Sequence, residues 1–246
     1  SSAPWIWLDA SDVSTFTTTD KGGVTAWADK GTRGHDATAY KVGDDQVYGT
    51  VGVTNGVPAY LMGPIASRID LAFERCTTIR TAFWVMDIAG KHAYDSDKIA
   101  FFLGDSNPYG WDFHGGYSGQ IASTDAKAAF LNGLFRIDGD GSYSGRLTSA
   151  YAPSGTHIYT SVSTDNLAAG QLSRDRVTST TRVGARALSE LVILTRPLAT
   201  NEIEAVELYL KTKWFGAAES VSSEGVAKPA YPSLTVNAGT GLVLGP

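Results

Sequence analysis

Short apolar runs, rich in β-branched and aromatic residues, alternate with Gly, Asp, Asn and Pro along most of the chain. This rhythm is typical of β-strands separated by turns, because strands place successive side chains on opposite faces and turns use residues that tolerate unusual backbone angles. The clearest runs are WIWL at 5–8, GVTAWA at 23–28, IRTAFWVMDI at 79–88, KIAFFLG at 98–104, HIYTSVS at 157–163 and ELVILTR at 190–196. The pattern predicts a fold made mainly of strands.

One late segment, residues 200–214, has helical periodicity instead. Its apolar positions recur at helical spacing, and they are Ile203, Val206, Leu210 and Trp214. Thr200 is placed to cap the first turn, Gly216 stands just beyond the end, and Pro197 would stop the preceding strand. Many strands and one helix at about 200–214 predict an all-β fold, an antiparallel two-sheet β-sandwich carrying that helix.

The composition changes after residue 216. Residues 217–233 are small, polar and proline-containing, as in a linker or a surface extension. Residues 234–246 hold two short alternating runs around the turn NAGTG, which predicts a β-hairpin-like tail. The β-sandwich is therefore expected over 1–216. The tail either pairs with the edge of the sandwich or opens a following module, and the linker before it favours the second alternative.

Composition and charge narrow the range of functions. A chain of 246 residues that is 43% hydrophobic can bury one large core. Its net charge of -5 and pI near 5.3 argue against nucleic acid as a partner, because binding to phosphates needs clustered Lys and Arg. No apolar run approaches the roughly 20 residues of a membrane helix, so no membrane span is expected. The single cysteine, Cys76, cannot form an internal disulfide.

Several motifs together resemble one family. They are WLDASD at 7–12, WADKGTRGHDAT at 27–38, FLGD at 102–105, DFHGG at 112–116 and SELVILTRPLATNEIEAVELYLKTKW at 189–214. In this order they resemble the concanavalin A-like, laminin G-like jelly-roll domains of large secreted or surface proteins of bacteria. The tail is similar to short repeats that follow such modules in long surface-anchored chains. The resemblance implies a lectin or glucanase fold and a secreted or cell-surface location, but no particular reaction, because family members bind carbohydrate, mediate adhesion or act as spacers.

The sequence lacks the usual catalytic signatures. Sandwich glycosidases of this fold class place carboxylates at alternate positions of one strand, and no E-x-D-x-E pattern occurs here. Glu190 in SEL is similar to one element of sandwich alginate lyases, but the other strands of that site are missing, so we interpret Glu190 as structural. None of the four histidines lies in a recognisable hydrolase motif. A function without catalysis is therefore favoured.

Two groups of aspartates are candidates for a calcium site, because lectin-like and laminin G-like sandwiches often use Ca²⁺ to fix a binding loop and Ca²⁺ prefers oxygen ligands. The first group is Asp95 and Asp97 in YDSD, with Asp105 in the next loop. The second is IDGDGS, with Asp138 and Asp140, where the spacing favours a turn. For the first group the alternative is likewise that the aspartates only build turns. Asp95, Asp97 and Asp105 are the predicted ligands.

An aromatic-rich stretch, GDSNPYGWDFHGGYSG at 104–119, is the candidate binding loop. Aromatic rings offer flat apolar faces to sugar rings, while nearby polar groups bond to the sugar hydroxyls. The predicted ligand-binding residues are Asn107, Tyr109, Trp111, His114 and Tyr117. If 110–114 is a strand, Trp111 and Phe113 point to one face and Asp112 and His114 to the other. Phe113 is then expected in the core.

These observations favour a non-catalytic carbohydrate-binding or adhesion module of a larger secreted or surface-attached bacterial protein. Its expected partners are a glycan or polysaccharide and the neighbouring modules of the same chain. The main alternative is an architectural spacer or protein-interaction domain without a small ligand. A glycan-active hydrolase or lyase is the third possibility.

Overall fold

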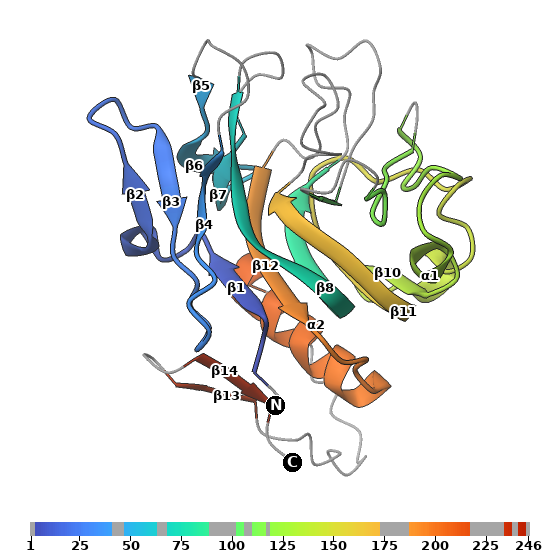
Figure 1. Ribbon diagram of the computed structural model, residues 1–246. Coiled ribbons are helices and arrows are strands. Elements are labelled where there is room, and N and C mark those ends of the chain that lie inside the picture. Colours follow the sequence, from blue (N-terminus) through green and yellow to red (C-terminus); the bar gives the residue numbers. More distant parts are fainter. Residues whose placement is uncertain are drawn as a thin grey trace.

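The computed structural model describes residues 3–40, 47–62, 68–88, 102–105, 110–116, 119–172, 187–216, 234–237 and 241–244. Its strands, labelled in Figure 1, are β1 (Ile6–Asp9), β2 (Phe16–Thr18), β3 (Val24–Trp27), β4 (Ala37–Tyr40), β5 (Val47–Tyr48), β6 (Thr50–Thr54), β7 (Val57–Leu61), β8 (Arg68–Asp87), β9 (Leu103–Gly104), β10 (Leu134–Ile137), β11 (Thr156–Leu172), β12 (Ala187–Leu194), β13 (Leu234–Asn237) and β14 (Gly241–Leu244). The helices are α1 (Ala128–Leu131) and α2 (Thr200–Phe215), and short 3₁₀ turns cover Val13–Thr15 and Gly141–Tyr143.

A single 12-stranded sheet forms the body of the protein. Its main path runs β2-β3-β4-β8-β12-β7-β6, with β1 added to β12 and with β11 added to β8. Among the described strands every pairing is antiparallel except that of β5 with β8. The sequence prediction of a mainly antiparallel β-fold with few helices is therefore confirmed. The division of the body into two sheets stays a prediction, because the described strands from β1 to β12 are joined in one sheet.

The sheet curls because its central strands are long and irregular. β8 has 20 residues and pairs with β4 near its start and with β12 near its end. β11 runs alongside β8, and its register shifts between Val162 and Leu167 and twice more before Gln171. Such bulges increase the local twist and bend a strand. An isolated β-bridge between Gly23 and Thr50 joins β6, at one end of the main path, to the residue before β3, near the other end.

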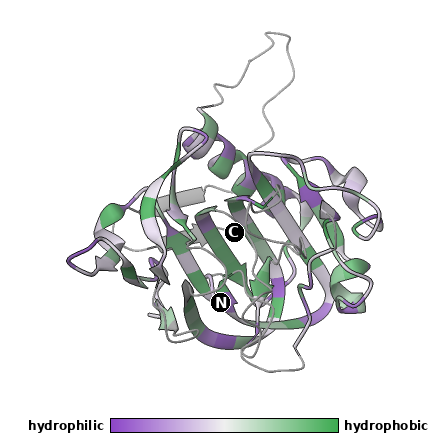
Figure 2. Ribbon diagram, turned by 90° about the horizontal axis from the view of Figure 1, so that it is seen from above, coloured by the Kyte–Doolittle hydropathy of each residue, from purple (hydrophilic) through white to green (hydrophobic). Residues whose placement is uncertain are grey.

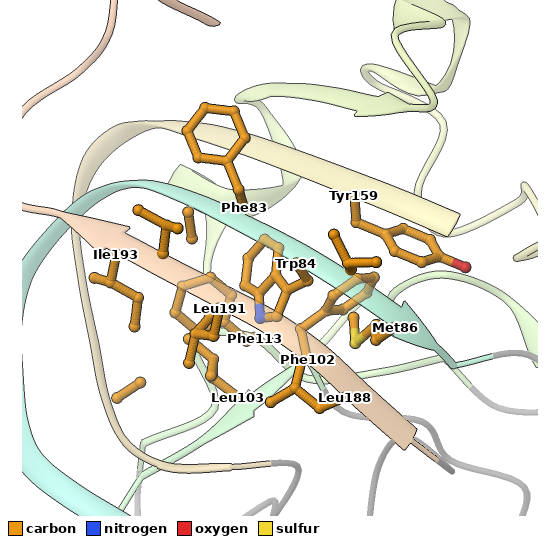
Figure 3. Close-up of a cluster of buried hydrophobic side chains, with 14 of the residues drawn as sticks. Phe83, Trp84, Met86, Phe102, Leu103, Phe113, Tyr159, Leu188, Leu191 and Ile193 are labelled. Carbon is orange, nitrogen blue, oxygen red and sulfur yellow. The ribbon is translucent and has the colours of Figure 1, made fainter. Parts of the chain in front are cut away.

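Alternate residues of β8 face two different layers. Phe83 lies opposite Thr160 of β11, and the Thr160 hydroxyl donates to Glu207 of α2, so this face of the sheet lies under α2. Trp84 points the other way, into an aromatic cluster with ring centroids 5.2 to 6.4 Å apart (Figure 3). The cluster consists of Trp84, Phe102, Phe113, Phe130, Phe135 and Tyr159. Apolar strand residues concentrate through the middle of the molecule (Figure 2).

The α2 helix agrees closely with the sequence prediction, whereas its N-terminal cap differs. It ends at Phe215 and is followed by Gly216 in the left-handed conformation, with φ of 60°. The N-cap is Ala199 rather than Thr200, so no side chain caps the helix from that position. Instead, Glu202 accepts a hydrogen bond from the Ala199 backbone N–H at 2.8 Å, and Arg196 binds both oxygens of Glu202 at 2.9 and 2.6 Å. The helix start is thus held by an ion pair.

The bond from Arg196 holds the pKa of Glu202 below its ordinary value of 4.5. A lowered carboxyl pKa contributes stability that is present above the ordinary value and lost as the pH falls through the folded value. We expect the wild type to lose up to about 1 kcal/mol more than Glu202→Gln between about pH 5 and pH 3, because the pair is partly exposed to solvent. Urea unfolding at each pH measures this. The exposed Glu204→Gln on the same helix is the control, and an equal acid loss in wild type and both variants would contradict the expectation.

The predicted tail hairpin is present. β13 and β14 pair in antiparallel register, with Leu234 opposite Leu244 and Val236 opposite Leu242. Together they form a two-stranded sheet of their own. The predicted linker at 217–233 lies outside the described residues.

Candidate functional site

The aromatic loop, meaning residues 102–105 and 110–116, is fastened to the core by two phenylalanines. Phe102 and Phe113 are each 2% exposed, and their rings lie 5.2 and 6.0 Å from that of Trp84. Figure 3 shows both side chains reaching the cluster beneath the sheet. The prediction that Phe113 belongs to the core is confirmed. The loop backbone is therefore held against a rigid surface.

Residues 110–114 form a turn and not the strand considered from the sequence. The His114 backbone N–H donates to the Trp111 carbonyl at 3.1 Å, which closes the turn. Phe113 and His114 are consequently both buried, whereas Trp111 is half-buried. The His114 Nδ1–H donates to the Gly115 carbonyl at 2.8 Å, and its ring meets that of Trp111 edge-on at 6.0 Å. Trp111 and His114 are both predicted ligand-binding residues, and of the two only Trp111 reaches the surface.

Asp105 is held inside the loop by Arg75. The guanidinium donates from Nε and Nη2 to the two carboxylate oxygens at 2.6 and 2.8 Å, and the Asp105 side chain is only 2% exposed. The hydrogen bond that Arg75 donates to Asp105 raises the pKa of Arg75. Gly110 passes so close that a Cβ there would lie 2.3 Å from an Asp105 oxygen, so only glycine fits at this position. The second half of the loop is thereby locked over the ion pair.

Asp112 ties the loop to β11 and to the segment before α1. One of its oxygens accepts from the Ala168 backbone N–H at 2.6 Å and lies 3.4 Å from the Lys127 Nζ. Lys127 also donates to the Asn166 carbonyl at 2.9 Å. We call Arg75, Asp105, Asp112 and Lys127 the charged rim. Together with the half-buried Trp111, the charged rim places aromatic and polar groups at one edge of the sheet.

The remaining predicted site residues lie outside the described part of the chain: Asn107, Tyr109 and Tyr117 of the binding loop, and Asp95 and Asp97 of the calcium site. Within the described residues no group of three or more His, Cys, Asp or Glu side chains could hold a metal. Both Asp105 oxygens bind the Arg75 guanidinium, which balances the charge of this carboxylate. The calcium site stays a prediction. Asp138 and Gly139, with φ of 52° and 90°, form the turn predicted for IDGDGS.

A second cluster of charged residues, not recognised from the sequence, lies between α2 and the sheet. Asp9 of β1 and Glu190 of β12 face each other across the strands, and Lys213 of α2 lies 2.7 Å from a carboxylate oxygen of each. Lys30 approaches Asp9 at 2.9 Å. We call Asp9, Lys30, Glu190 and Lys213 the buried ion cluster. Charges that interrupt apolar runs, as in IWLD and KTKW, are the sequence signal that points to it.

Two tryptophans donate hydrogen bonds to the Glu190 carboxylate. The indole N–H of Trp7 donates to one oxygen at 2.7 Å, and that of Trp214 donates to the other. Burial raises the pKa of Glu190, although Lys213 opposes the shift. Burial also raises the pKa of Asp9. The charge of Lys213 and the hydrogen bonds from Lys213, Ser11 and Lys30 lower it by more, so the pKa of Asp9 lies below its ordinary value.

Paired carboxylates perform glycoside hydrolysis in other proteins, but here they are covered. Asp9 is 2% exposed and Glu190 1% exposed, so a substrate cannot contact them without removal of α2. A further buried carboxylate, that of Glu207, binds Arg136 at 3.1 Å and the Thr160 hydroxyl at 2.7 Å. Glu190 is thus buried and bound within the buried ion cluster, and its interpretation as a structural residue stays a prediction.

Comparison with protein-family models gives no match, and no significant match is found among curated proteins or solved structures. The family suggested by the motifs therefore stays a prediction. Within the described ranges, no helix combines the length and apolar character needed to cross a membrane.

Proposed function

We propose that this chain is a non-catalytic carbohydrate-binding or adhesion module of a larger secreted or surface-attached bacterial protein. The observation that supports the proposal most directly is the aromatic loop, which combines a half-buried tryptophan with a charged rim on a backbone fastened to the core. The proposal includes a concanavalin A-like sandwich of two sheets, with the curled sheet as its basis. Glycans and neighbouring modules are the proposed partners.

The use of the buried carboxylates supports a function without catalysis. Asp9, Asp105, Glu190 and Glu207 each bind a cationic side chain in the interior. Buried charges of this kind need such partners for the fold itself, because an unpaired buried charge is costly. An acid and a nucleophile or base would instead have to face a cleft that a substrate can enter.

The two cations of the charged rim, Arg75 and Lys127, have bonding capacity left for a ligand. A guanidinium has five N–H donors and an ammonium group has three. The Lys127 side chain is 47% exposed and that of Arg75 is 35% exposed, so both cations reach solvent. Lys127 binds Asp112, which follows Trp111, and Arg75 binds Asp105, which lies against Gly110, the residue before Trp111. A sugar ring stacked on the indole would bring its hydroxyls within reach of these groups.

A broad glycan array, with calcium and again with chelator, tests the function. We expect the wild type to bind at least one class of glycan, and we expect Trp111→Ala and Tyr109→Ala/Tyr117→Ala to weaken that binding by about tenfold or more. Tyr151→Ala removes a tyrosine that is 62% exposed outside the loop and serves as the matched control. A loss of binding in chelator would support the proposed calcium site.

Absence of binding under both conditions would overturn the glycan proposal and favour the spacer or protein-interaction alternative. Binding that survives in both loop variants would support the carbohydrate-binding function but would show that the aromatic loop is not the binding site. Release of shortened glycan products by the wild type would contradict the assignment as non-catalytic.

A further inference from the structure

A small pocket lies beside α1, apart from the aromatic loop. It has a volume of about 290 Å³ and is lined by Thr124, Leu131, Asn132, Gly145, Leu147 and Thr148. In Figure 1, α1 lies beside β10, on the opposite side of the molecule from β2. We propose that this pocket binds one neutral sugar residue. The inference rests on the proposed carbohydrate-binding function and gives it a second, separate site.

The walls of the pocket are fixed by backbone and core contacts. α1 is anchored by Phe130, which is fully buried and whose ring lies 5.2 Å from that of Phe113. The Ala122 backbone N–H donates to the Leu147 carbonyl at 2.9 Å, which joins the segment before α1 to the segment after Gly145. A pocket formed in advance costs less ordering on binding than one that must assemble around its ligand.

The chemistry of the lining matches a sugar. The half-buried Leu131 supplies an apolar surface for the C–H groups of a ring, and Leu147, which belongs to the buried core, lines the pocket behind it. Thr124, Asn132 and Thr148 are exposed at the rim and bring two hydroxyls and one amide. No side-chain hydrogen bond within the described part of the chain engages these three groups. They are therefore available to donate to and accept from the hydroxyls of a ligand.

Size and charge define the ligand further. Ligand pockets usually span about 300–1,000 Å³, so this one lies at the lower limit and suits a single ring rather than a longer chain. The six lining residues are all uncharged, so the lining offers no counter-charge to a uronic acid or an amino sugar. The position where a Cβ of Gly145 would stand has no atom within 4 Å, which leaves that side of the pocket open for the rest of a glycan.

Titration of the ¹⁵N-labelled protein, followed by amide chemical shifts, tests the pocket directly. The probes are the methyl glycosides of D-glucose, D-galactose, D-mannose and N-acetyl-D-glucosamine, with D-glucuronic acid and D-glucosamine as charged comparisons. We expect at least one neutral sugar to shift the amides of Gly145, Leu147 and Thr148 in a saturable way. The charged comparisons should bind at least about tenfold more weakly.

Paired variants separate binding from folding. Asn132→Ala/Thr148→Val should lower the affinity for the sugar by about tenfold or more. The control Asn201→Ala/Thr18→Val makes the same changes at exposed positions elsewhere and should leave the affinity within about twofold of the wild-type value. Saturable shifts confined to residues 110–116 would overturn the proposal that the pocket binds sugar, but they would support the carbohydrate-binding function. Stronger binding of a charged sugar, or no saturable shift with any neutral sugar, would also overturn the pocket. In the latter case the glycan array still decides the function separately.

Discussion

Lys213→Met should destabilise the protein by about 3–5 kcal/mol at neutral pH, because it leaves the carboxylates of Asp9 and Glu190 facing each other without their shared ammonium group. Both carboxylates are almost fully buried, so water cannot replace Lys213 without opening the contact between α2 and the sheet. Unfolding in urea, followed by tryptophan fluorescence, measures the change. Lys211→Met is the matched control on the same helix, because the Lys211 ammonium donates to an exposed carbonyl, that of Asp138, and lies outside the buried ion cluster.

A second substitution tests the cause. Glu190→Gln in the Lys213→Met background removes one of the two buried negative charges, and it should recover part of the lost stability. A cost for Lys213→Met no larger than that for Lys211→Met would show that the buried ion cluster does not hold α2. Failure of Glu190→Gln to recover any stability would show that the loss comes from packing rather than from charge.

Phe113→Ala should cost about 3–5 kcal/mol, the usual range for removing a buried aromatic side chain. Its ring lies between those of Trp84 and Phe130, at 6.0 and 5.2 Å, so truncation leaves a cavity bounded by side chains from β8 and α1. Unfolding in urea, followed by tryptophan fluorescence, measures this loss of stability as well. The aromatic loop should also become more open to exchange of its amide hydrogens, because Phe113 is one of the two side chains that fasten it.

Tyr151→Ala provides the comparison for Phe113→Ala. The Tyr151 side chain is 62% exposed, and its removal should change the stability by no more than about 0.5 kcal/mol. If Phe113→Ala cost less than about 1 kcal/mol, Phe113 could not be an anchor of the loop.

The elements that the sequence predicts well are those whose signal is local. The helix at 200–214 agrees with α2 because its apolar residues follow one helical face and because Gly216 allows a left-handed end. Phe113 is buried as predicted, although the strand alternation that predicted it is absent: residues 110–114 form a turn, and the large aromatic side chain still packs in the core. The turn at Asp138 and Gly139 was predictable because this pair favours positive φ.

The features that the sequence does not reveal depend on contacts between distant segments. Nothing in the neighbourhood of Asp9 indicates that its partner is Lys213, since the two meet only after β1 has paired with β12 and α2 has packed on both. The N-cap of α2 is Ala199 and not Thr200, and the contact that holds this helix start is the Ala199 N–H donating to Glu202, which Arg196 binds in turn. The candidate strand at 110–114 is a turn, closed by the hydrogen bond from the His114 backbone N–H to the Trp111 carbonyl.

The pairing of β1 with β12 also determines when the domain can form during synthesis. Trp7 and Glu190, which share a hydrogen bond, are 183 residues apart in the chain. At about 5–20 residues per second, a ribosome needs roughly 10–40 s to make the intervening segment. Throughout that time Ile6 and Leu8 have no strand to cover them, so the nascent chain carries an apolar segment open to other molecules. The interval ends when α2 emerges and Lys213 joins Asp9 to Glu190. The native state of this domain is therefore reached only after α2 has been synthesised.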